Sequence, residues 1–411
     1  MPEFLILSSP EQALKKWFSA MPNNPRQSEE IDSILGLNRF TSSPICSKKP
    51  YPEFSRSTVD GYAVRAVDTF GAGESLPAYF SVIGEVPMGK KPEFASTVGS
   101  AALIHTGGML PVGADAVVML EYAQLSKNGE LEVVRAIAPN ENVIQMGEDV
   151  VAGQIVIPVG SRLRPAEIGG LMSLGQIKVQ VVCRPVIGIL SSGDEVIEPT
   201  IEPQPGQVRD INSFSLSAQI EEWGGLPIHL GIALDRAEAL HIALASALEN
   251  CDAVIVTAGS SASIRDLTAQ VIDEMGTPGV LVHGVNIHPG KPTILAVCNG
   301  KAVVGLPGNP VSALVIARRF VKPLIEHLSG CAKVFPLPTL PAILTVNLPS
   351  QSGREDWWPV RLLTTPQGMN ADPIFYKSNL IFNYTQADGL IQISADATGL
   401  IAGSHVDVYP L

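Results

Sequence analysis

The sequence of 411 residues contains few cysteines, and their arrangement excludes two classes of small structural site. Its five cysteines are odd in number and scattered, with no C-x-x-C pair: Cys46, Cys183, Cys251, Cys298 and Cys331. Neither a disulfide framework nor a zinc site has this pattern. We therefore expect reduced, mostly buried thiols, as in a cytosolic protein.

Long apolar runs and excess positive charge are also lacking. No run approaches the roughly 20 apolar residues of a membrane span, and the N-terminus has no positive region ahead of its short apolar stretch, unlike a signal peptide. The net charge of −12 disfavours non-specific binding to nucleic acid, which requires a basic surface. We expect a cytoplasmic protein with no membrane or nucleic-acid partner, although a local basic pocket for a small anion fits the composition.

Three common nucleotide and nucleophile motifs are absent from the sequence. It has no Walker A motif, no G-x-G-x-x-G opening a helix after a strand, and no serine in a G-x-S-x-G elbow. The absence of these motifs disfavours generic ATPase, dehydrogenase and hydrolase functions.

The chain is too long for one hydrophobic core, and its pattern predicts several domains of roughly 100–200 residues or less. Ser9, Pro10 and Gln12 predict a helix start, with a helix running through Trp17. Short β-rich runs predict a compact β domain over 51–139, and residues 183–330 alternate apolar runs with amphipathic helices, as in a doubly wound parallel sheet. Residues 336–411 return to short strands typical of a β-barrel or sandwich.

Acids and hydroxyl groups follow the predicted parallel strands, where ligands bind in open α/β sheets. Asp194 and Glu195 follow the first strand in SSGDEV, and such a carboxylate pair suits Mg²⁺ beside a phosphate. Ser260, Ser261 and Asp266 follow the strand AVIVTA, and hydroxyl groups there suit an anion. For Asp194 and Glu195, the alternative is an ordinary charged turn. For the serine loop, the alternative is a βα turn capped by Ser263, in which Asp266 stabilises the first helical turn.

Two further loops carry groups that suit anions. Lys291 lies in HPGKP, between two prolines, and can act as a point charge for an oxyanion. Asn309 lies in LPGNP, which opens a helix whose backbone N–H groups suit a phosphate. A surface lysine and a simple helix start are the alternatives. The acids Asp60 and Asp149 lie on segments that read locally as ordinary turns.

Taken in order, these motifs resemble the MoeA family of molybdenum cofactor biosynthesis proteins, which includes the gephyrin E domain. The resemblance covers nearly the whole chain and rests on STVDGYAVRAVDT, HTGGMLPVGADAVVMLE, NVIQMGEDVVAG, SSGDEV, GQVRDINS, the serine loop through Asp266, HPGKP, GLPGNPVSA, SGRED and KSNLIFNYTQADG. No single motif is decisive, but ten in register are highly specific.

The resemblance implies an elongated homodimer whose subunit has four parts. These are a connecting and dimerisation domain (1–50 and 140–182), an inserted β domain (51–139), a molybdopterin-binding α/β domain (183–330) and a C-terminal β-barrel (336–411). It also implies a molybdenum insertase that converts adenylyl-molybdopterin and molybdate to molybdenum cofactor and AMP with Mg²⁺. A molybdopterin adenylyltransferase is then a further expected partner.

The resemblance also implies roles for individual residues. Asp60, Glu195, Asp266 and Lys291 are expected to be catalytic, and Asp194, Glu195 and Asp266 to bind Mg²⁺. The expected substrate contacts are Thr106, Asp149, Ser192, Asp194, Asp210, Asn212, Ser260, Ser261, Asn309, Arg354 and Ser378. Of all these residues, Asp60, Thr106 and Asp149 are expected to come from the other subunit, while Lys291 and Arg354 are candidates to hold the molybdate dianion.

The chain departs from the family pattern at two positions. Ser263 replaces a usual glycine, and His288 replaces a frequent lysine or arginine, which weakens the positive charge at neutral pH. Alternative functions are a tungstate-specific paralogue and a non-catalytic molybdopterin-binding scaffold. An adenylyltransferase would resemble the α/β domain alone.

Overall fold

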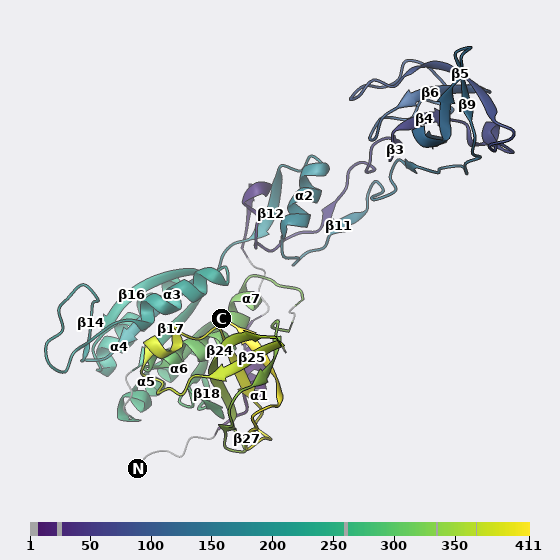
Figure 1. Cartoon of the computed structure of the whole chain (residues 1–411). Coiled ribbons are helices and arrows are strands. Elements are labelled where there is room, and N and C mark those ends of the chain that lie inside the picture. Colours follow the sequence, from purple (N-terminus) through teal and green to yellow (C-terminus); the bar gives the residue numbers. More distant parts are fainter. Residues whose placement is uncertain (1–6, 23–26, 259–261, 334–335, 367) are drawn as a thin grey trace.

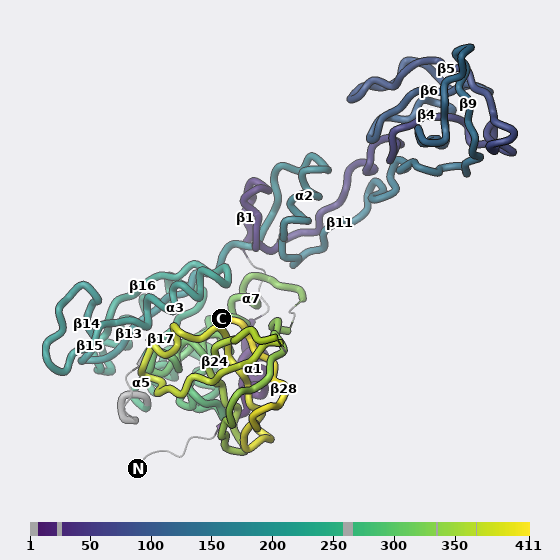
Figure 2. Tube along the Cα trace, in the orientation of Figure 1, coloured from purple at the N-terminus to yellow at the C-terminus, as the bar shows by residue number. Residues whose placement is uncertain are grey.

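The computed structural model describes residues 7–22, 27–258, 262–333, 336–366 and 368–411. The molecule is elongated, with a β domain at one end, a small connecting unit in the middle, and an α/β domain beside a C-terminal barrel at the other end (Figure 1). The Cα trace runs out through the connecting unit to the β domain and returns through the same unit (Figure 2). The β domain is thus an insertion.

The connecting unit joins the outgoing and returning chain through short antiparallel pairs. Its elements are β1 (Ser28–Asp32) with β12 (Lys178–Val182), β2 (Ile45–Cys46) with β11 (Ile155–Ile157), the short helix η1 (Ser33–Leu35) and α2 (Pro165–Ser173). Ile45, Leu163, Leu171 and Val181 form a small apolar core. The pair β3 (Arg56–Ser57) and β10 (Val143–Ile144) continues this double strand toward the β domain.

The β domain is built on a six-stranded sheet of order β7-β4-β6-β5-β9-β8. Phe80, Val118 and Leu131 lie in its core. The elements are β4 (Gly61–Val64), η2 (Ala66–Thr69), β5 (Ala78–Glu85), β6 (Ser100–Ile104), β7 (Ala116–Met119), η3 (Leu120–Tyr122), β8 (Ala123–Leu125) and β9 (Glu130–Val133).

The α/β domain contains a sheet of order β16-β13-β17-β21-β20-β18. Its strands are β13 (Val186–Ser192), β16 (Leu226–Ala233), β17 (Ala253–Ala258), β18 (Pro278–His283), β20 (Ile294–Cys298) and β21 (Lys301–Pro307). The expected wholly parallel sheet is wrong at one edge, because β20 runs antiparallel to both β21 and β18. Asn299 and Gly300, both with positive φ, join β20 to β21, and so tight a turn can join only antiparallel strands.

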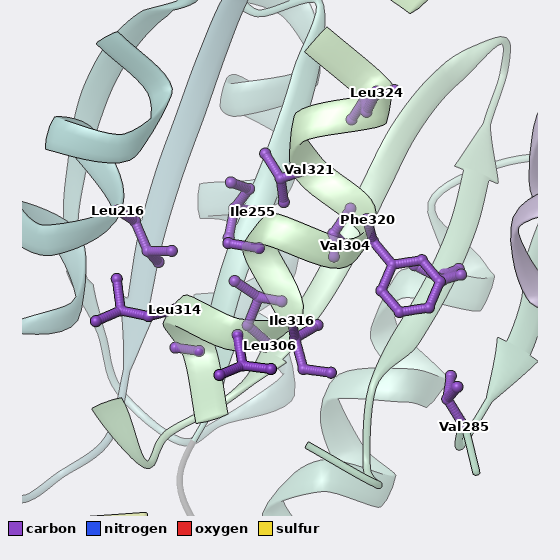
Figure 3. Packing of buried hydrophobic residues seen from close by; sticks show 14 of the residues in the cluster. Leu216, Ile255, Val285, Val304, Leu306, Leu314, Ile316, Phe320, Val321 and Leu324 are labelled. Atoms are coloured by element: carbon purple, nitrogen blue, oxygen red, sulfur yellow. The ribbon is translucent and has the colours of Figure 1, made fainter. Parts of the chain in front are cut away.

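Helices cover both faces of this sheet, as expected. They are α3 (Asn212–Glu222), α4 (Ala237–Asn250), α5 (Ala262–Glu274), α6 (Pro310–Ile316), the π-helical turn η4 (Ala317–Val321) and α7 (Lys322–Leu328), while β14 (Val196–Ile197) and β15 (Val208–Arg209) form a small parallel pair outside the sheet. Figure 3 shows Ile255, Val304 and Phe320 among the buried side chains that pack between the strands and the α6–α7 segment.

The first helix, α1 (Pro10–Ser19), has the predicted capping box of Ser9 and Gln12. The resemblance places residues 1–50 in the connecting domain. The helix does not belong to that unit, however. Trp17 is fully buried in the core of the α/β domain and donates from Nε1 to Ala296 O at 2.8 Å. The apolar face of this helix is therefore satisfied by the sheet rather than by its neighbours in sequence.

The C-terminal domain is a barrel that closes where β24 pairs with both β25 and β26. Its elements are β22 (Leu340–Leu344), β23 (Leu348–Pro349), β24 (Glu355–Thr365), β25 (Gly368–Pro373), α8 (Ile381–Tyr384), β26 (Gly389–Ile393), β27 (Gly399–Leu400) and β28 (His405–Pro410). A short strand of the α/β domain, β19 (Ile287–His288), pairs in parallel with β24.

Side chains reinforce this contact between the two domains. Arg318 donates to Pro410 O at 2.5 Å, and Arg319 lies 2.5 Å from Glu11 Oε1 and 3.4 Å from Glu355 Oε1. The α/β domain and the barrel are thereby fastened together beside the loop that carries Lys291.

The cysteines follow the prediction only in part. All five are free, but only Cys251 and Cys298 are buried, and Cys46 is exposed. Burial raises the pKa of the Cys298 thiol to about 11, which keeps it protonated and unreactive near neutral pH.

Among the described residues, no helix is long and apolar enough to cross a membrane.

Gly290 sets the path of the loop that carries Lys291, and its replacement tests how tightly that loop is held. Gly290 has φ +113°, and an added Cβ would lie 2.2 Å from Cγ1 of buried Ile316. We expect Gly290→Ala to lower the free energy of unfolding by about 3 kcal/mol, from backbone strain and overpacking together. Urea-induced unfolding measures the change.

Gly353 provides the matched control. It has φ +92° but nothing within 4 Å of an added Cβ, so Gly353→Ala should cost about 1 kcal/mol from backbone strain alone. Equal costs at both positions would contradict the close packing of Gly290 against Ile316.

Candidate functional site

A buried cluster of hydroxyl groups surrounds one carboxylate where the central strands of the α/β sheet end. Ser191 and Thr257 are partners in the β13–β17 register, and their hydroxyl oxygens lie 3.1 Å apart. Asp210 Oδ2 accepts from the hydroxyls of Ser191 at 2.7 Å and Ser213 at 2.6 Å, and its Oδ1 accepts from the Ser213 backbone N–H at 3.1 Å. Asp210 therefore anchors the start of α3 to the strand ends.

A cavity of about 390 Å³ opens beside this cluster, at the carboxyl ends of β13, β17 and β21. We call it the strand-end cavity. Its position is the one expected for a ligand in an open α/β sheet. The structure brings five of the expected site residues to its wall: Ser192, Glu195, Asp210, Asn212 and Asn309.

Asn212 presents an unused acceptor at this cavity. Its Nδ2 donates to Gly308 O at 2.8 Å, whereas its buried Oδ1 has no hydrogen-bond partner among the described residues. A buried acceptor without a partner costs about 1–3 kcal/mol. A ligand with an N–H or O–H group could remove this cost by donating to Asn212 Oδ1.

Asp235 joins the expected acids at one end of the strand-end cavity. It lies two residues after the end of β16, and its carboxylate accepts a short hydrogen bond from the Ser192 hydroxyl. Its backbone N–H donates to Asp194 Oδ1 at 3.2 Å. These contacts fix the Ser192–Asp194 turn, which places Glu195 on the cavity wall.

Two smaller cavities extend the site toward the barrel. The lysine cavity, of about 220 Å³, is lined by residues 288–292, 307–309, Ser312 and Ser378, and it shares Gly308 and Asn309 with the strand-end cavity. The arginine cavity, of about 240 Å³, is lined by Arg354 and shares His288 and Lys291 with the lysine cavity. Because neighbouring cavities share lining residues, the three lie in a row from the strand ends toward the barrel.

Ser378 reaches the lysine cavity because its loop is tied to the start of α6. Asn309 Nδ2 donates to Ser378 Oγ at 3.0 Å, and the Val311 N–H donates to Ser378 O at 3.1 Å. The LPGNP motif predicts that the backbone N–H groups of this helix start are available to a phosphate. The Val311 N–H is not free, because the barrel loop already occupies it.

The two expected oxyanion-binding cations differ in their pairing. Arg354 makes a two-point contact with the buried carboxylate of Asp356, from Nε at 2.7 Å and Nη2 at 3.1 Å. Lys291 is exposed, and none of the ion pairs formed by the described residues includes it. Lys291 therefore carries an unbalanced positive charge into the row of cavities.

Asp60 and Thr106 lie together in the β domain, which is at the other end of the molecule from the α/β domain and the barrel (Figure 1). Asp60 Oδ1 accepts from the Thr106 N–H at 2.7 Å and from its hydroxyl at 3.2 Å. These two hydrogen bonds, with a smaller contribution from His105, lower the pKa of Asp60 below its ordinary value. The structure thus pairs these two expected residues, but not with Lys291 of the same chain.

The remaining expected residues are dispersed. Asp149 lies in the double strand beside the β domain, where its N–H donates to Tyr51 O at 3.2 Å. Asp266 is exposed on α5, which begins at Ala262. Ser260 and Ser261 lie outside the described residues.

The expected Mg²⁺ ligands do not form a metal cage. Among the described residues, no group of three or more His, Cys, Asp or Glu side chains could hold a metal ion. Asp194, Glu195 and Asp266 are therefore not assembled as a three-carboxylate site. Mg²⁺ does not require such a site, because it commonly binds one or two carboxylates together with substrate phosphates and water.

Sequence reasoning missed Asp235 and Asp356. Asp235 directly follows the predicted strand LPIHLGIAL, so the rule that identified Asp194 would also have found it. Asp356 lies in the SGRED motif, but its role depends on pairing with Arg354 in the folded chain.

Comparisons with known proteins cover the chain from end to end. Residues 8–175 match the MoeA N-terminal region (domain I and II), residues 188–327 the "Probable molybdopterin binding domain", and residues 341–411 the MoeA C-terminal region (domain IV). Molybdopterin molybdenumtransferase from Haemophilus influenzae is 32% identical over 97% of this chain and 98% of its own. The protein of that name from a Nostoc species is 31% identical over 96% and 92%.

Solved structures show the same correspondence. A molybdopterin biosynthesis MoeA protein from Pyrococcus horikoshii is 37% identical, with a TM-score of 0.80 over 98% of this chain and 99% of that chain. A second such structure from the same organism has a TM-score of 0.84 at 30% identity, over 98% and 100%.

The roles of Asp210 and Asp266 can be separated by stability. We expect Asp210→Ala to lower the free energy of unfolding by about 2–4 kcal/mol, because it leaves buried donors of Ser191 and Ser213 without their acceptor. The exposed Asp266 is the matched acid, and Asp266→Ala should stay within about 0.5 kcal/mol of the parent. Equal unfolding midpoints in urea for the two variants would contradict the anchoring role of Asp210.

Proposed function

The chain belongs to the MoeA family of molybdopterin biosynthesis proteins, and we propose that it is a molybdopterin molybdenumtransferase, a molybdenum insertase. In this proposal adenylyl-molybdopterin and molybdate are its substrates, and molybdenum cofactor and AMP are its products. The observation that carries the proposal is the row of three cavities, which begins at the polar strand ends and reaches the unpaired Lys291.

The dimensions and chemistry of the row suit an extended anionic substrate. The strand-end cavity offers the unpartnered acceptor Asn212 Oδ1, which suits an amino or ring N–H group of a pterin or adenine. Beyond Asn309, the lysine cavity offers a positive charge to an oxyanion. A substrate with a heterocycle at one end and an oxyanion at the other could therefore use both cavities at once.

Mg²⁺ fits the acidic end of the strand-end cavity. Glu195 lines the cavity, and Asp194 lies in the same turn, so these two acids would hold the ion together with phosphate oxygens of the substrate. When bound, Mg²⁺ neutralises charge on the phosphate oxygens as the phosphoanhydride is cleaved.

The protein side chains contribute positioning and charge. Lys291 attracts molybdate and stabilises negative charge beside it, because no carboxylate among the described residues forms an ion pair with the lysine. Asp356 holds Arg354 toward the arginine cavity by a two-point contact, so that Arg354 contributes direction more than net charge. Asp235 fixes the turn that carries the proposed Mg²⁺ ligands.

A homodimer would bring Asp60 and Thr106 to the cavities of the other subunit. The connecting unit carries an apolar patch formed by Ile34, Leu35 and Ile177, which are 69%, 67% and 68% exposed. The Ser33 N–H donates to Ile177 O, so the two segments of the patch are adjacent. Burying this patch against a second copy would place the elongated subunits side by side.

The reaction can be tested directly with purified protein. Given adenylyl-molybdopterin, Mg²⁺ and molybdate, it should release AMP, and Lys291→Ala should slow release by about 100-fold or more, as expected for lost charge stabilisation. AMP is measured by chromatography, with a no-enzyme control.

Two alternative outcomes would identify the competing functions. Binding of molybdopterin without AMP release by a folded dimer would favour a scaffold. Tungstate is the oxyanion to compare, because it has nearly the same size and charge as molybdate. A clear preference for tungstate in the same assay would favour the tungstate-specific paralogue.

The shared site can be tested by mixing two inactive variants. Asp60→Ala and Lys291→Ala remove groups that lie in different domains of one chain. If each site takes Asp60 from one copy and Lys291 from the other, a mixed dimer has one intact site, and AMP release should recover. Mixed dimers that stay as inactive as the two parents would contradict the shared site.

A further inference from the structure

His288 lies between the lysine cavity and the arginine cavity and lines both of them. Its backbone belongs to β19, which pairs with β24 so that His288 is the register partner of Asp356. Its side chain is 46% exposed, with Nδ1 3.9 Å from Asp356 Oδ1. An ion bound beside Lys291 would therefore lie next to an imidazole that already has one carboxylate neighbour.

The charged groups around His288 come from two elements and the loop after β19. Lys291 lies in that loop, Arg354 precedes β24, and Asp356 lies on β24. The remaining acid of β24, Glu355, is engaged elsewhere, since it accepts from Trp357 Nε1 and pairs with Arg319. Among described residues that line the two smaller cavities, His288, Lys291 and Arg354 are the ionisable ones.

While His288 is neutral, the site lacks one of the two positive charges that would balance a dianion. Arg354 and Asp356 cancel one another, so Lys291 supplies a net charge of one when His288 is neutral. Molybdate is a dianion near neutral pH, so its binding would leave one negative charge unbalanced in a partly enclosed site. Protonation of His288 adds the missing positive charge.

We propose that His288 makes oxyanion capture proton-linked, so that binding of the dianion beside Lys291 draws one proton from solvent onto the His288 imidazole. The inference rests on the proposed function, in which this site receives molybdate. It adds a specificity device, because a dianion gains more from the second positive charge than a monoanion does.

The electrostatic surroundings of His288 agree with this proposal. Burial lowers the pKa of His288 below its ordinary value, Asp356 partly opposes that change, and Arg354 lowers it further. The imidazole is thus mostly neutral at neutral pH before the ion arrives. A dianion bound beside His288 favours the charged imidazole and raises its pKa. The affinity for the dianion is therefore highest below the pKa of His288 in the free protein, and it falls as the pH rises from that value to the raised pKa of the bound state.

Binding of molybdate alone to the full chain tests the linkage. Calorimetric titrations between about pH 5.5 and about pH 8 span the ordinary histidine pKa. We expect affinity to fall with rising pH, by up to about tenfold per pH unit, the limit for one linked proton. Repeating each titration in buffers with different ionisation enthalpies measures the proton uptake.

Two variants separate His288 from the other ionisable groups. His288→Gln should bind molybdate weakly, with little dependence on pH, whereas His288→Lys should bind tightly and lose the proton uptake. Thermal unfolding verifies that both variants are folded. A parental pH slope retained in His288→Gln would overturn the inference but leave the proposed function intact, whereas no binding by the parent at any pH would count against both.

Histidine resonances give a second, structural readout. In the chain labelled with ¹³C-histidine, the resonance that disappears in His288→Gln identifies the imidazole. Its pKa should rise when molybdate is added, and an unchanged pKa at saturating molybdate would overturn the inference even if both variants proved unstable.

Discussion

The parallel pairing of β19 with β24 is the contact on which the candidate site depends. It crosses from the α/β domain to the barrel, sets His288 beside Asp356, and places Arg354 one residue before the shared strand. The loop that follows β19 carries Lys291, and Gly290 packs that loop against Ile316. One short pairing therefore brings together groups separated by more than 60 positions in the sequence.

Two kinds of polar organisation meet at the site. At the strand ends, Asp210 accepts from hydroxyl and backbone donors and lines the strand-end cavity, and Asp235 accepts from the hydroxyl of the neighbouring Ser192. Toward the barrel, Lys291 keeps its charge unpaired, and Arg354 is oriented by Asp356. The acids at the strand ends thus hold the surrounding segments in place. The attraction for anions comes from Lys291, which forms no ion pair with the described residues.

The sequence predicted the parts of the fold that local pattern determines. The sequence correctly predicts the capping box of α1 and the alternation of strands and helices over 183–330, because both depend on neighbouring residues. The antiparallel edge was missed although Asn299-Gly300 is a strong hairpin signal. The placement of Trp17 could not be read, because the helix packs against β20, nearly 280 positions away.

The site divides in the same way. The ends of strands point to Asp194 and Glu195, since their position follows from chain direction alone, whereas Ser192 is expected only from the family resemblance. The pairing of Thr106 with Asp60 joins segments 46 positions apart, which sequence pattern does not bring together, whereas the pairing of Asp356 with Arg354 depends on the local path of the chain as it enters β24. The double strand that carries the β domain has a mechanical consequence for Asp60. Its strand pairs are only two or three residues long and Asp60 lies beyond them, so a small rotation within the connecting unit would move Asp60 over a larger distance.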